Sequence, residues 1–386
     1  MAERFKAPVL KTGVPKGTVS SNLTLSAMIT QTVGTDPPFF ITPRYSMNTR
    51  FLDACWGKPV DRTPVWLMRQ AGRYLPQYMT VRSKCTFLEL CKTPELAAEV
   101  TIQPVDILGV DAAILFSDIL TPVEPMGLKL DFVPGPVFEN PVRTMADVER
   151  LRIPDPEADV PYVLETIRIL RRELATKVPL IGFGGAPFTL ACYMVEGKGS
   201  KDWAAIKRMM YAAPEVYAAL MEKVTMMDME YLNGQIKAGA QAIQIFDTWG
   251  GVLSPSDYQK FVLPYTTRLI NGLNRQNIPV IHFVKGAGTM LPMVQQAGGD
   301  VMGLDWHISL ASARDQLGPN VAVQGNLDPT VLFAPQAVIE QEVKRVLDEN
   351  AGRPGHIFNL GHGILPTVPV ENAIQMVESV HRLSQR

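Results

Sequence analysis

Two arginines four residues apart follow an apolar run early in the chain. Arg69 and Arg73 come directly after residues 64–68, with Gly72 between them. If this turn is helical, both side chains lie on one face, and each planar guanidinium group could hold a carboxylate through two parallel hydrogen bonds. The pair therefore suggests binding of an anionic small molecule. An ordinary salt-bridged surface pair fits the spacing as well, although Gly72 at a strand end favours a binding site.

Asp118 and His362 are two further candidates. Asp118 is flanked by apolar residues, where a functional carboxylate and a helix N-cap are about equally well supported. His362 stands between Gly361 and Gly363, and glycine allows the backbone to come close to a ligand. Asp305 resembles Asp118 in its surroundings, and there a structural role is the favoured interpretation.

Several familiar catalytic centres have no counterpart in the sequence. The histidines and cysteines contain no pair in zinc-ligand spacing and no C-x-x-C, so a metal site is not expected. No G-x-S-x-G elbow marks a serine nucleophile. The glycine-rich residues 182–185 follow a strand, but Pro187 stands where a dinucleotide fingerprint would continue. We interpret that run as a tight turn.

Composition indicates a globular protein with a balanced surface. The chain has 386 residues, of which 46% are hydrophobic and 19% charged, and a formal net charge of -1. This balance argues against a nucleic-acid partner, because phosphate binding usually needs a marked basic excess. No apolar run is long enough to predict a membrane span, and the sparse, unpaired cysteines predict a reducing, cytoplasmic setting.

Residues 1–46 differ from the rest of the chain. They are rich in Ser and Thr, contain only Glu3 and Asp36 as acids, and show no helical or strand period. They also lack the arginines of a transit peptide and the apolar core of a secretory signal. We expect either a disordered extension or a non-native one that results from a start upstream of Met47, with a targeting segment as the alternative.

From residue 47 onward one pattern repeats: a short apolar run, a turn marked by Gly or Pro, and an amphipathic helix. The apolar runs suit parallel strands buried on both faces. Helices are predicted around Val163 and Ile167, around Val216, and after Pro335. The last of these carries Val338, Val343 and Val346. Eight alternations predict a single (β/α)8 TIM barrel over residues 47–386, with an open doubly wound sheet as the alternative. The predicted strands are residues 64–68, 112–116, 180–183, 242–246, 280–283, 301–304, 321–323 and 357–360.

Polar residues recur where these predicted strands end. Barrel enzymes carry their active sites at the C-terminal ends of their strands, so we expect these residues to gather at one rim. They are Arg69, Arg73, Asp118, Tyr193, Asp247, Thr248, Lys285, Asp305, Gln324, Asn326 and His362.

Taken together, the strand-end motifs resemble one family, uroporphyrinogen decarboxylase, in its bacterial form. The matching stretches run in family order from about Asn48 to the end of the chain, and the first is long enough to be diagnostic by itself. They are Pro64-Val-Trp-Leu-Met-Arg-Gln-Ala-Gly-Arg-Tyr-Leu-Pro76, Phe116-Ser-Asp-Ile-Leu120, Tyr193-Met-Val-Glu-Gly197, Phe246-Asp-Thr-Trp-Gly-Gly251, Gly303-Leu-Asp-Trp306, Gln324-Gly-Asn-Leu-Asp-Pro329 and Asn359-Leu-Gly-His-Gly363.

The resemblance implies a homodimeric carboxy-lyase of haem and tetrapyrrole biosynthesis that needs neither metal nor organic cofactor. Such an enzyme converts the four acetate side chains of uroporphyrinogen III to methyls, giving coproporphyrinogen III. A protonated pyrrole of the substrate serves as the electron sink, and the resemblance assigns stabilisation of that cation to Asp118. The substrate-binding residues that it implies are Arg69, Gln70, Ala71, Gly72, Arg73, Asp118, Tyr193, Thr248 and His362, with Asp118 and Arg69 catalytic.

Two departures from the family pattern and several alternatives stand beside this interpretation. The family often has a longer Gly-rich loop where this chain has only residues 134–136, and some members carry Ser in place of Thr248. The proton donor is open: Arg69 is a reluctant acid, and a substrate carboxyl or a water would also serve. The alternative functions are a corrinoid-linked methyltransferase of the same fold, normally with a zinc site, and a non-catalytic tetrapyrrole-binding protein.

Overall fold

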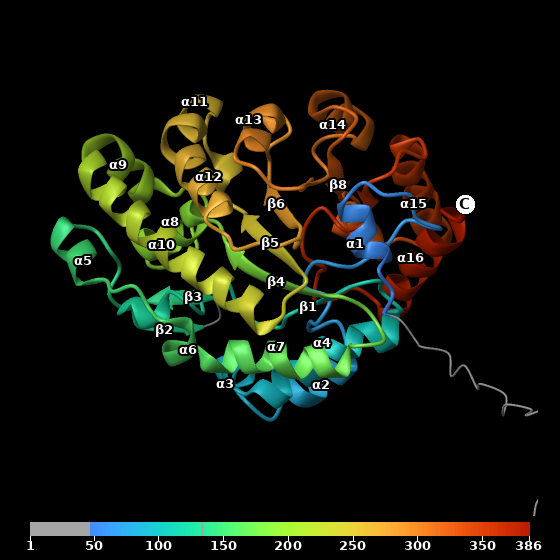
Figure 1. The fold of residues 1–386 in the computed structure, drawn as a ribbon, viewed down its shortest axis with the longest axis horizontal. Helices are drawn as coiled ribbons and strands as arrows, with labels where there is room; N and C mark the ends of the chain where they lie inside the picture. Colours follow the sequence, from blue (N-terminus) through green and yellow to red (C-terminus); the bar gives the residue numbers. More distant parts are fainter. Residues whose placement is uncertain (1–46, 133–134) are drawn as a thin grey trace, which may run out of the picture. The chain divides into compact units, whose positions relative to one another are not determined.

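The computed structural model describes residues 47–132 and 135–386. The expected extension of residues 1–46, and Pro134 of the short loop, lie outside the described residues. The described chain is an α/β fold in which a curled parallel sheet is surrounded by helices (Figure 1). No helix in this part of the chain is both long enough and apolar enough to cross a membrane.

Seven parallel strands form the main sheet, and they pair in the order in which they occur along the chain. Every residue of the long central strands is buried, which explains why continuous apolar runs rather than alternating ones mark them in the sequence. Seven of the eight predicted strands are therefore confirmed. They are β1 (Ala113–Ile114), β4 (Leu180–Gly185), β5 (Ala242–Asp247), β6 (Val280–Val284), β7 (Val301–Gly303), β8 (Ala322–Gln324) and β9 (His356–Ile357).

The eighth predicted strand, at residues 64–68, is present as a single bridge between the two edges of this sheet. Val65 forms a parallel bridge with Phe358, and the Phe358 amide donates to the Pro64 carbonyl oxygen at 2.8 Å. On the other side, the Asp111 amide donates to the Val65 carbonyl oxygen at 2.7 Å. The segment closes the ring between β9 and β1, so the predicted (β/α)8 barrel is confirmed.

A buried carboxylate holds this seam together. Asp111 Oδ2 accepts the Val65 amide at 3.0 Å, which takes the place of a further strand partner. The same carboxylate accepts hydrogen bonds from Asn48 at 3.1 Å, from Arg50 at 2.8 Å and from His381 at 2.8 Å. Burial opposes ionisation of Asp111, but these donors outweigh it and lower its pKa. The carboxylate therefore stays charged and joins both ends of the described chain to the first strand.

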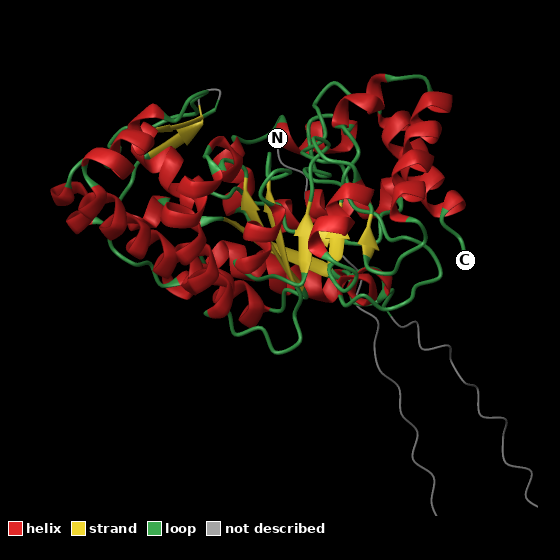
Figure 2. Cartoon of the chain, turned by 90° about the horizontal axis from the view of Figure 1, so that it is seen from above, coloured by secondary structure: helices red, strands yellow, loops and turns green. Residues whose placement is uncertain are grey.

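Helices cover the outside of the sheet (Figure 2). The predicted apolar faces around Val163 in α7 and Val216 in α10 are buried. Helix α15 forms where predicted, with Val343 and Val346 buried, but Val338 is exposed, so that part of the prediction was wrong: Ile339 is the buried residue at this point of the helix. The helices are α1 (Arg50–Cys55), α2 (Pro76–Arg82), α3 (Phe87–Lys92), α4 (Pro94–Leu108), α5 (Met145–Arg150), α6 (Pro156–Asp159), α7 (Pro161–Glu173), α8 (Pro187–Glu196), α9 (Ala204–Ala212), α10 (Pro214–Ala238), α11 (Pro255–Asp257), α12 (Leu263–Asn271), α13 (Leu291–Gln296), α14 (Leu310–Leu317), α15 (Gln336–Asn350) and α16 (Val370–Leu383).

The glycines of residues 182–185 lie inside strand β4, so their prediction as a tight turn was wrong. A Cβ on Gly182 would come within 2.5 Å of the Gln235 side-chain oxygen, and one on Gly184 within 2.7 Å of an Asp228 carboxylate oxygen. Gln235, on α10, also exchanges two hydrogen bonds of 2.8 Å with the amide and carbonyl of Phe183. Glycine is needed here because polar side chains of α10 dock directly onto the backbone of the strand.

A two-stranded hairpin accompanies the barrel, and the sequence did not predict it. Strand β2 (Leu130–Phe132) pairs antiparallel with β3 (Pro136–Phe138), and both lie apart from the main sheet (Figure 2). Val137 also bridges to Lys198, which ties the hairpin to the segment after α8. The hairpin matters for function because Phe132 and Pro136 reach the cavity described next.

Candidate active site

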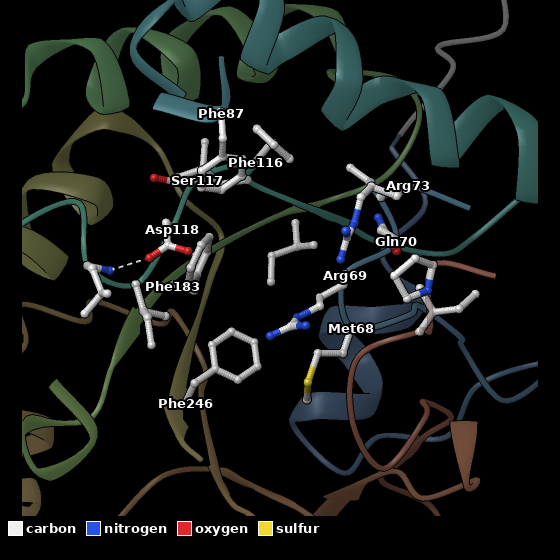
Figure 3. Close-up of a pocket in the computed structure, with 18 of the residues that line it drawn as sticks. Met68, Arg69, Gln70, Arg73, Phe87, Phe116, Ser117, Asp118, Phe183 and Phe246 are labelled. Atoms are coloured by element: carbon white, nitrogen blue, oxygen red, sulfur yellow. Dashed lines mark hydrogen bonds between the residues drawn. The ribbon is translucent and has the colours of Figure 1, made fainter. Parts of the chain in front are cut away.

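A cavity of about 480 Å³ lies beyond the C-terminal ends of β1, β4 and β5 (Figure 3). This volume lies in the range of small-molecule sites. The structure brings together every residue predicted to bind substrate, because all of them line this cavity. They are Arg69, Gln70, Ala71, Gly72, Arg73, Asp118, Tyr193, Thr248 and His362.

Arg69 reaches the cavity from an unusual backbone conformation. Its φ is 64°, in the left-handed region that residues other than glycine rarely adopt. Two glycines make room for it: a Cβ on Gly72 would lie 2.9 Å from the Arg69 carbonyl oxygen, and one on Gly363 would lie 2.4 Å from Arg69 Cδ. Gly363 therefore admits the arginine side chain, where the sequence predicted room for a ligand. Strained backbone of this kind is usually kept where function requires it.

Three guanidinium groups line the cavity. Arg69 and Arg73 follow the first strand segment, and both point into the cavity in Figure 3. Arg82, at the end of α2, is the third, and the sequence analysis missed it. Its position in the helix that follows Arg73 could have indicated that it belongs to the same site. Within residues 47–132 and 135–386, none of the three forms an ion pair with a carboxylate, so the alternative of a salt-bridged surface pair does not hold for this part of the chain.

Asp118 lies across the cavity from Arg69 (Figure 3). Its Oδ1 accepts the Leu120 amide at 2.9 Å, so it caps a short turn rather than a helix. Burial raises the pKa of Asp118, against the hydrogen bond from Leu120 and the positive charge of Arg69. No hydrogen bond from the described residues reaches Oδ2, which leaves that oxygen for a ligand.

Gln70 lines the cavity, but its side chain is occupied by the backbone of the barrel. Its Oε1 accepts the Leu67 amide at 3.1 Å, and its Nε2 donates to the Ala112 carbonyl oxygen at 3.1 Å. The Tyr74 hydroxyl donates to the Gln70 carbonyl oxygen at 2.8 Å. Gln70 therefore fixes the turn that carries Arg69, and its side-chain amide has little hydrogen-bonding capacity left for a ligand.

Three polar side chains enter from other elements: Tyr193 from α8, Thr248 after β5, and His362 after β9. Burial raises the pKa of Tyr193. Burial, together with the positive charges of Arg69 and Lys285, lowers the pKa of His362 to about 3. At neutral pH these groups therefore offer hydrogen bonds rather than charge.

Aromatic rings form much of the remaining wall. The Phe183 and Phe246 ring centroids are 5.7 Å apart, and those of Phe87 and Phe132 are 4.9 Å apart. These rings were not predicted from the sequence to line a site, because a phenylalanine beside other apolar residues looks like core. The phenylalanines that line the cavity are Phe87, Phe116, Phe132, Phe183 and Phe246.

Most of the other strand-end residues predicted for the rim hold the barrel together. Asp247 is buried, accepts the Thr189 hydroxyl at 2.7 Å, and has a pKa raised to about 6 by burial. Asn326 donates to the Asp305 carbonyl oxygen at 2.9 Å, and both are buried, in line with the structural role favoured for Asp305. Gln324 is buried as well. None of these residues lines the described cavity.

Comparisons with known proteins agree with the motifs of the site. The family model described as uroporphyrinogen decarboxylase matches residues 46–383. A uroporphyrinogen decarboxylase from Geobacter metallireducens is 89% identical over 340 residues, which are 88% of this chain and 100% of that protein. One from Citrifermentans bemidjiense is 82% identical over the same shares of both chains. The chain belongs to the uroporphyrinogen decarboxylase family.

This membership confirms the resemblance drawn from the strand-end motifs, and the relatives named here are bacterial.

Solved structures show which proteins share the fold. A methyltransferase from Methanosarcina mazei superposes with a TM-score of 0.74 at 21% identity, covering 87% of this chain and 98% of that one. A B12-independent methionine synthase from a Shewanella species gives a TM-score of 0.51 at 12% identity, covering 78% and 91%. At such identities the likeness shows a shared fold alone. Among the described residues of this chain, no three His, Cys, Asp or Glu side chains are grouped so that they could hold a metal ion.

Proposed function

We propose that the chain decarboxylates the four acetate side chains of uroporphyrinogen III to methyl groups, giving coproporphyrinogen III for haem or related tetrapyrrole synthesis. The observation that carries this proposal is the placement of Arg69 and Arg73 in one cavity with Asp118 across from Arg69. Family membership supports the same substrate. Aromatic walls between these charged groups suit a macrocycle that carries its carboxylates at the edge.

Each decarboxylation needs a place for the electron pair of the broken carbon–carbon bond. In the proposed reaction a proton adds to a pyrrole carbon and makes the ring a cation. The bond between the acetate methylene and its carboxylate then breaks, CO2 leaves, and the electron pair neutralises the ring. A proton adds to the methylene carbon, and the ring gives up the first proton. The substrate itself provides the electron sink.

The protein's part is to stabilise the cation and to hold the substrate. The free Oδ2 of Asp118 suits the pyrrole N–H groups, and a cationic ring beside it would favour the charged carboxylate that burial disfavours. A preorganised charge of this kind can be a large contribution to catalysis. Arg69 and Arg73 would hold carboxylates, while Tyr193 and His362 would orient the macrocycle through neutral hydrogen bonds together with Thr248.

Anaerobic incubation with uroporphyrinogen III tests this proposal. The final product should have lost all four acetate carboxyls and kept the others, which mass spectrometry of the oxidised porphyrins counts directly. Unchanged substrate after incubation with folded protein would reject the proposal, and tight binding without turnover would identify a tetrapyrrole-binding protein. Turnover that disappears on chelation and returns with zinc would favour chemistry like that of the methyltransferases.

We further propose that the chain works as a homodimer in the cytoplasm, and that residues 1–46 lie outside the barrel domain of residues 47–386. The homodimer rests on the family resemblance, and the cytoplasmic setting rests on four cysteines that are all free thiols. Sedimentation should give twice the mass of the chain. Removal of residues 1–46 should leave turnover nearly unchanged, and loss of most activity would place that segment in the working enzyme.

A further inference from the structure

Lys285 stands directly after β6, beside the candidate active site. Strands β5 and β6 pair in parallel up to Asp247 and Val284, and the Lys285 amide continues the ladder by donating to the Asp247 carbonyl oxygen at 3.3 Å. The next residue of the neighbouring chain segment is Thr248, which lines the cavity. The backbone of Lys285 therefore lies at the mouth of the barrel, next to the wall of the cavity.

The alternation of side chains along a strand indicates where Lys285 points. Residues two apart project to the same side, so Lys285 follows Phe283. The Phe283 ring centroid lies 6.3 Å from that of Phe246 and 6.4 Å from that of His362, both of which line the cavity. Lys285 is thus two residues beyond Phe283, in the turn that follows β6 and on the side that faces His362, although it is not itself one of the residues that line the cavity.

The Lys285 ammonium group makes no ion pair within the described part of the chain, although the Asp305 carboxylate accepts the amide of the next residue, Gly286. The lysine Nζ lies 5.9 Å from the Trp306 ring centroid, and the side chain is only half-buried. The positive charges of Lys285 and Arg69 both help to lower the pKa of His362. A cation that makes no ion pair within the protein is available to an anionic ligand.

We propose that Lys285 forms a second carboxylate subsite with His362, beside the cavity at the ends of β5 and β6, and holds an acetate or propionate of the substrate there. This inference rests on the proposed function. The substrate has carboxylates around its whole edge, whereas Arg69, Arg73 and Arg82 all come from the chain between the first strand segment and the end of α2. Lys285, which follows β6, adds a cation on another side of the site.

The choice of lysine also fits repeated use of one site. Decarboxylation of four acetates requires the macrocycle to present different edges in turn, so the carboxylate at this subsite changes its position from step to step. A lysine is a point charge on a flexible four-carbon stem, which can follow such changes, while the planar fork of an arginine demands one geometry.

Steady-state kinetics with uroporphyrinogen III and three variants test the subsite. Lys285→Met keeps the length of the stem and removes the charge, Lys285→Arg keeps the charge, and Lys260→Met is the control. Lys260 also places its Nζ near an aromatic ring, 4.7 Å from the Phe261 centroid, but it is exposed and lies within the helical segment Tyr258–Val262 rather than at the end of a strand. We expect Lys285→Met to raise KM about tenfold or more with kcat changed far less, because a charge-assisted contact is lost in substrate and transition state alike. Lys285→Arg should recover much of this loss.

Two results would overturn the subsite: an unchanged KM in folded Lys285→Met, or equal losses in the Met and Arg variants. A fall in kcat at constant KM would also overturn it, since the lysine would then act on the reaction rather than on substrate binding. Thermal melting checks folding, and Lys285→Gln replaces the Met variant if that one does not fold. Wild type and Lys260→Met report separately on the proposed function, because both must turn over uroporphyrinogen III for that function to stand.

Discussion

Gly363→Ala should damage the active site through a single methyl group. The new Cβ would lie 2.4 Å from Arg69 Cδ and 2.9 Å from Cγ, whereas ordinary contacts begin at 3.4 Å. Arg69 must therefore move by about 1 Å, and a displacement of that size in a positioned group can lower turnover by about 10²-fold. The φ of Gly363 is not positive, so alanine fits its backbone, and the fold should lose little stability.

The assay is kcat/KM for uroporphyrinogen III in wild type, Gly363→Ala, Arg69→Ala and the double variant. Once Arg69 is truncated, the added methyl has nothing to displace, so the double variant should be no worse than Arg69→Ala. Gly199→Ala is the matched control, because a Cβ there would meet open space. Wild-type turnover in Gly363→Ala would refute the reasoning, and so would an equal loss from the methyl group in both backgrounds.

Further predictions concern three polar residues of the cavity. Asp118→Asn should keep most hydrogen bonding and still bind product, but turnover of the folded protein should fall by about 10²–10³-fold. Asp118→Glu should recover part of this loss. Near-native turnover of folded Asp118→Asn would exclude the electrostatic role. Arg69→Lys should lose most turnover because the two-pronged contact is lost, whereas a merely structural arginine would leave turnover intact. The pKa of His362 is lowered from 6.5 to about 3, so turnover profiles of wild type and His362→Gln should have the same shape between about pH 5 and pH 8. The same shift makes the unfolded chain take up a proton that the folded chain does not, so wild type should lose stability relative to His362→Gln as the pH falls from 6.5 toward 3.

The barrel was predictable because its strands are buried on both faces and therefore appear as apolar runs. The predictions failed where a side chain distant in the sequence decides the structure. The glycines of β4 resemble a turn until Gln235 and Asp228 of α10 are seen docked onto the strand. Residues 64–68 shrink to a single bridge because the carboxylate of Asp111 takes the amide of Val65. Neither the α10 side chains on β4 nor the carboxylate on Val65 can be predicted from the local sequence.

The site was predictable to a similar degree. The residues that the family resemblance implies for substrate binding line one cavity, in line with active sites at the C-terminal ends of barrel strands. The phenylalanines of the wall were missed because an apolar residue at a strand end gives no sign of whether it faces the core or a ligand. Gln70 shows the opposite difficulty: its motif is intact, yet its amide serves Leu67 and Ala112 rather than the empty space of the cavity.

C-terminal residues stabilise the segment that carries Arg69, because they contact the seam where the barrel closes. The segment that delivers Arg69 joins the sheet through one bridge, and Asp111 binds both the amide and the carbonyl group of Val65 in it. One of the donors to that carboxylate is His381 in the last turn of α16, while the Ser384 hydroxyl accepts the Thr63 amide at 2.9 Å. Removal of the C-terminal residues from His381 onward should therefore loosen the segment that carries Arg69, although none of the removed residues lines the cavity. The first sign would be faster amide hydrogen exchange at residues 64–68.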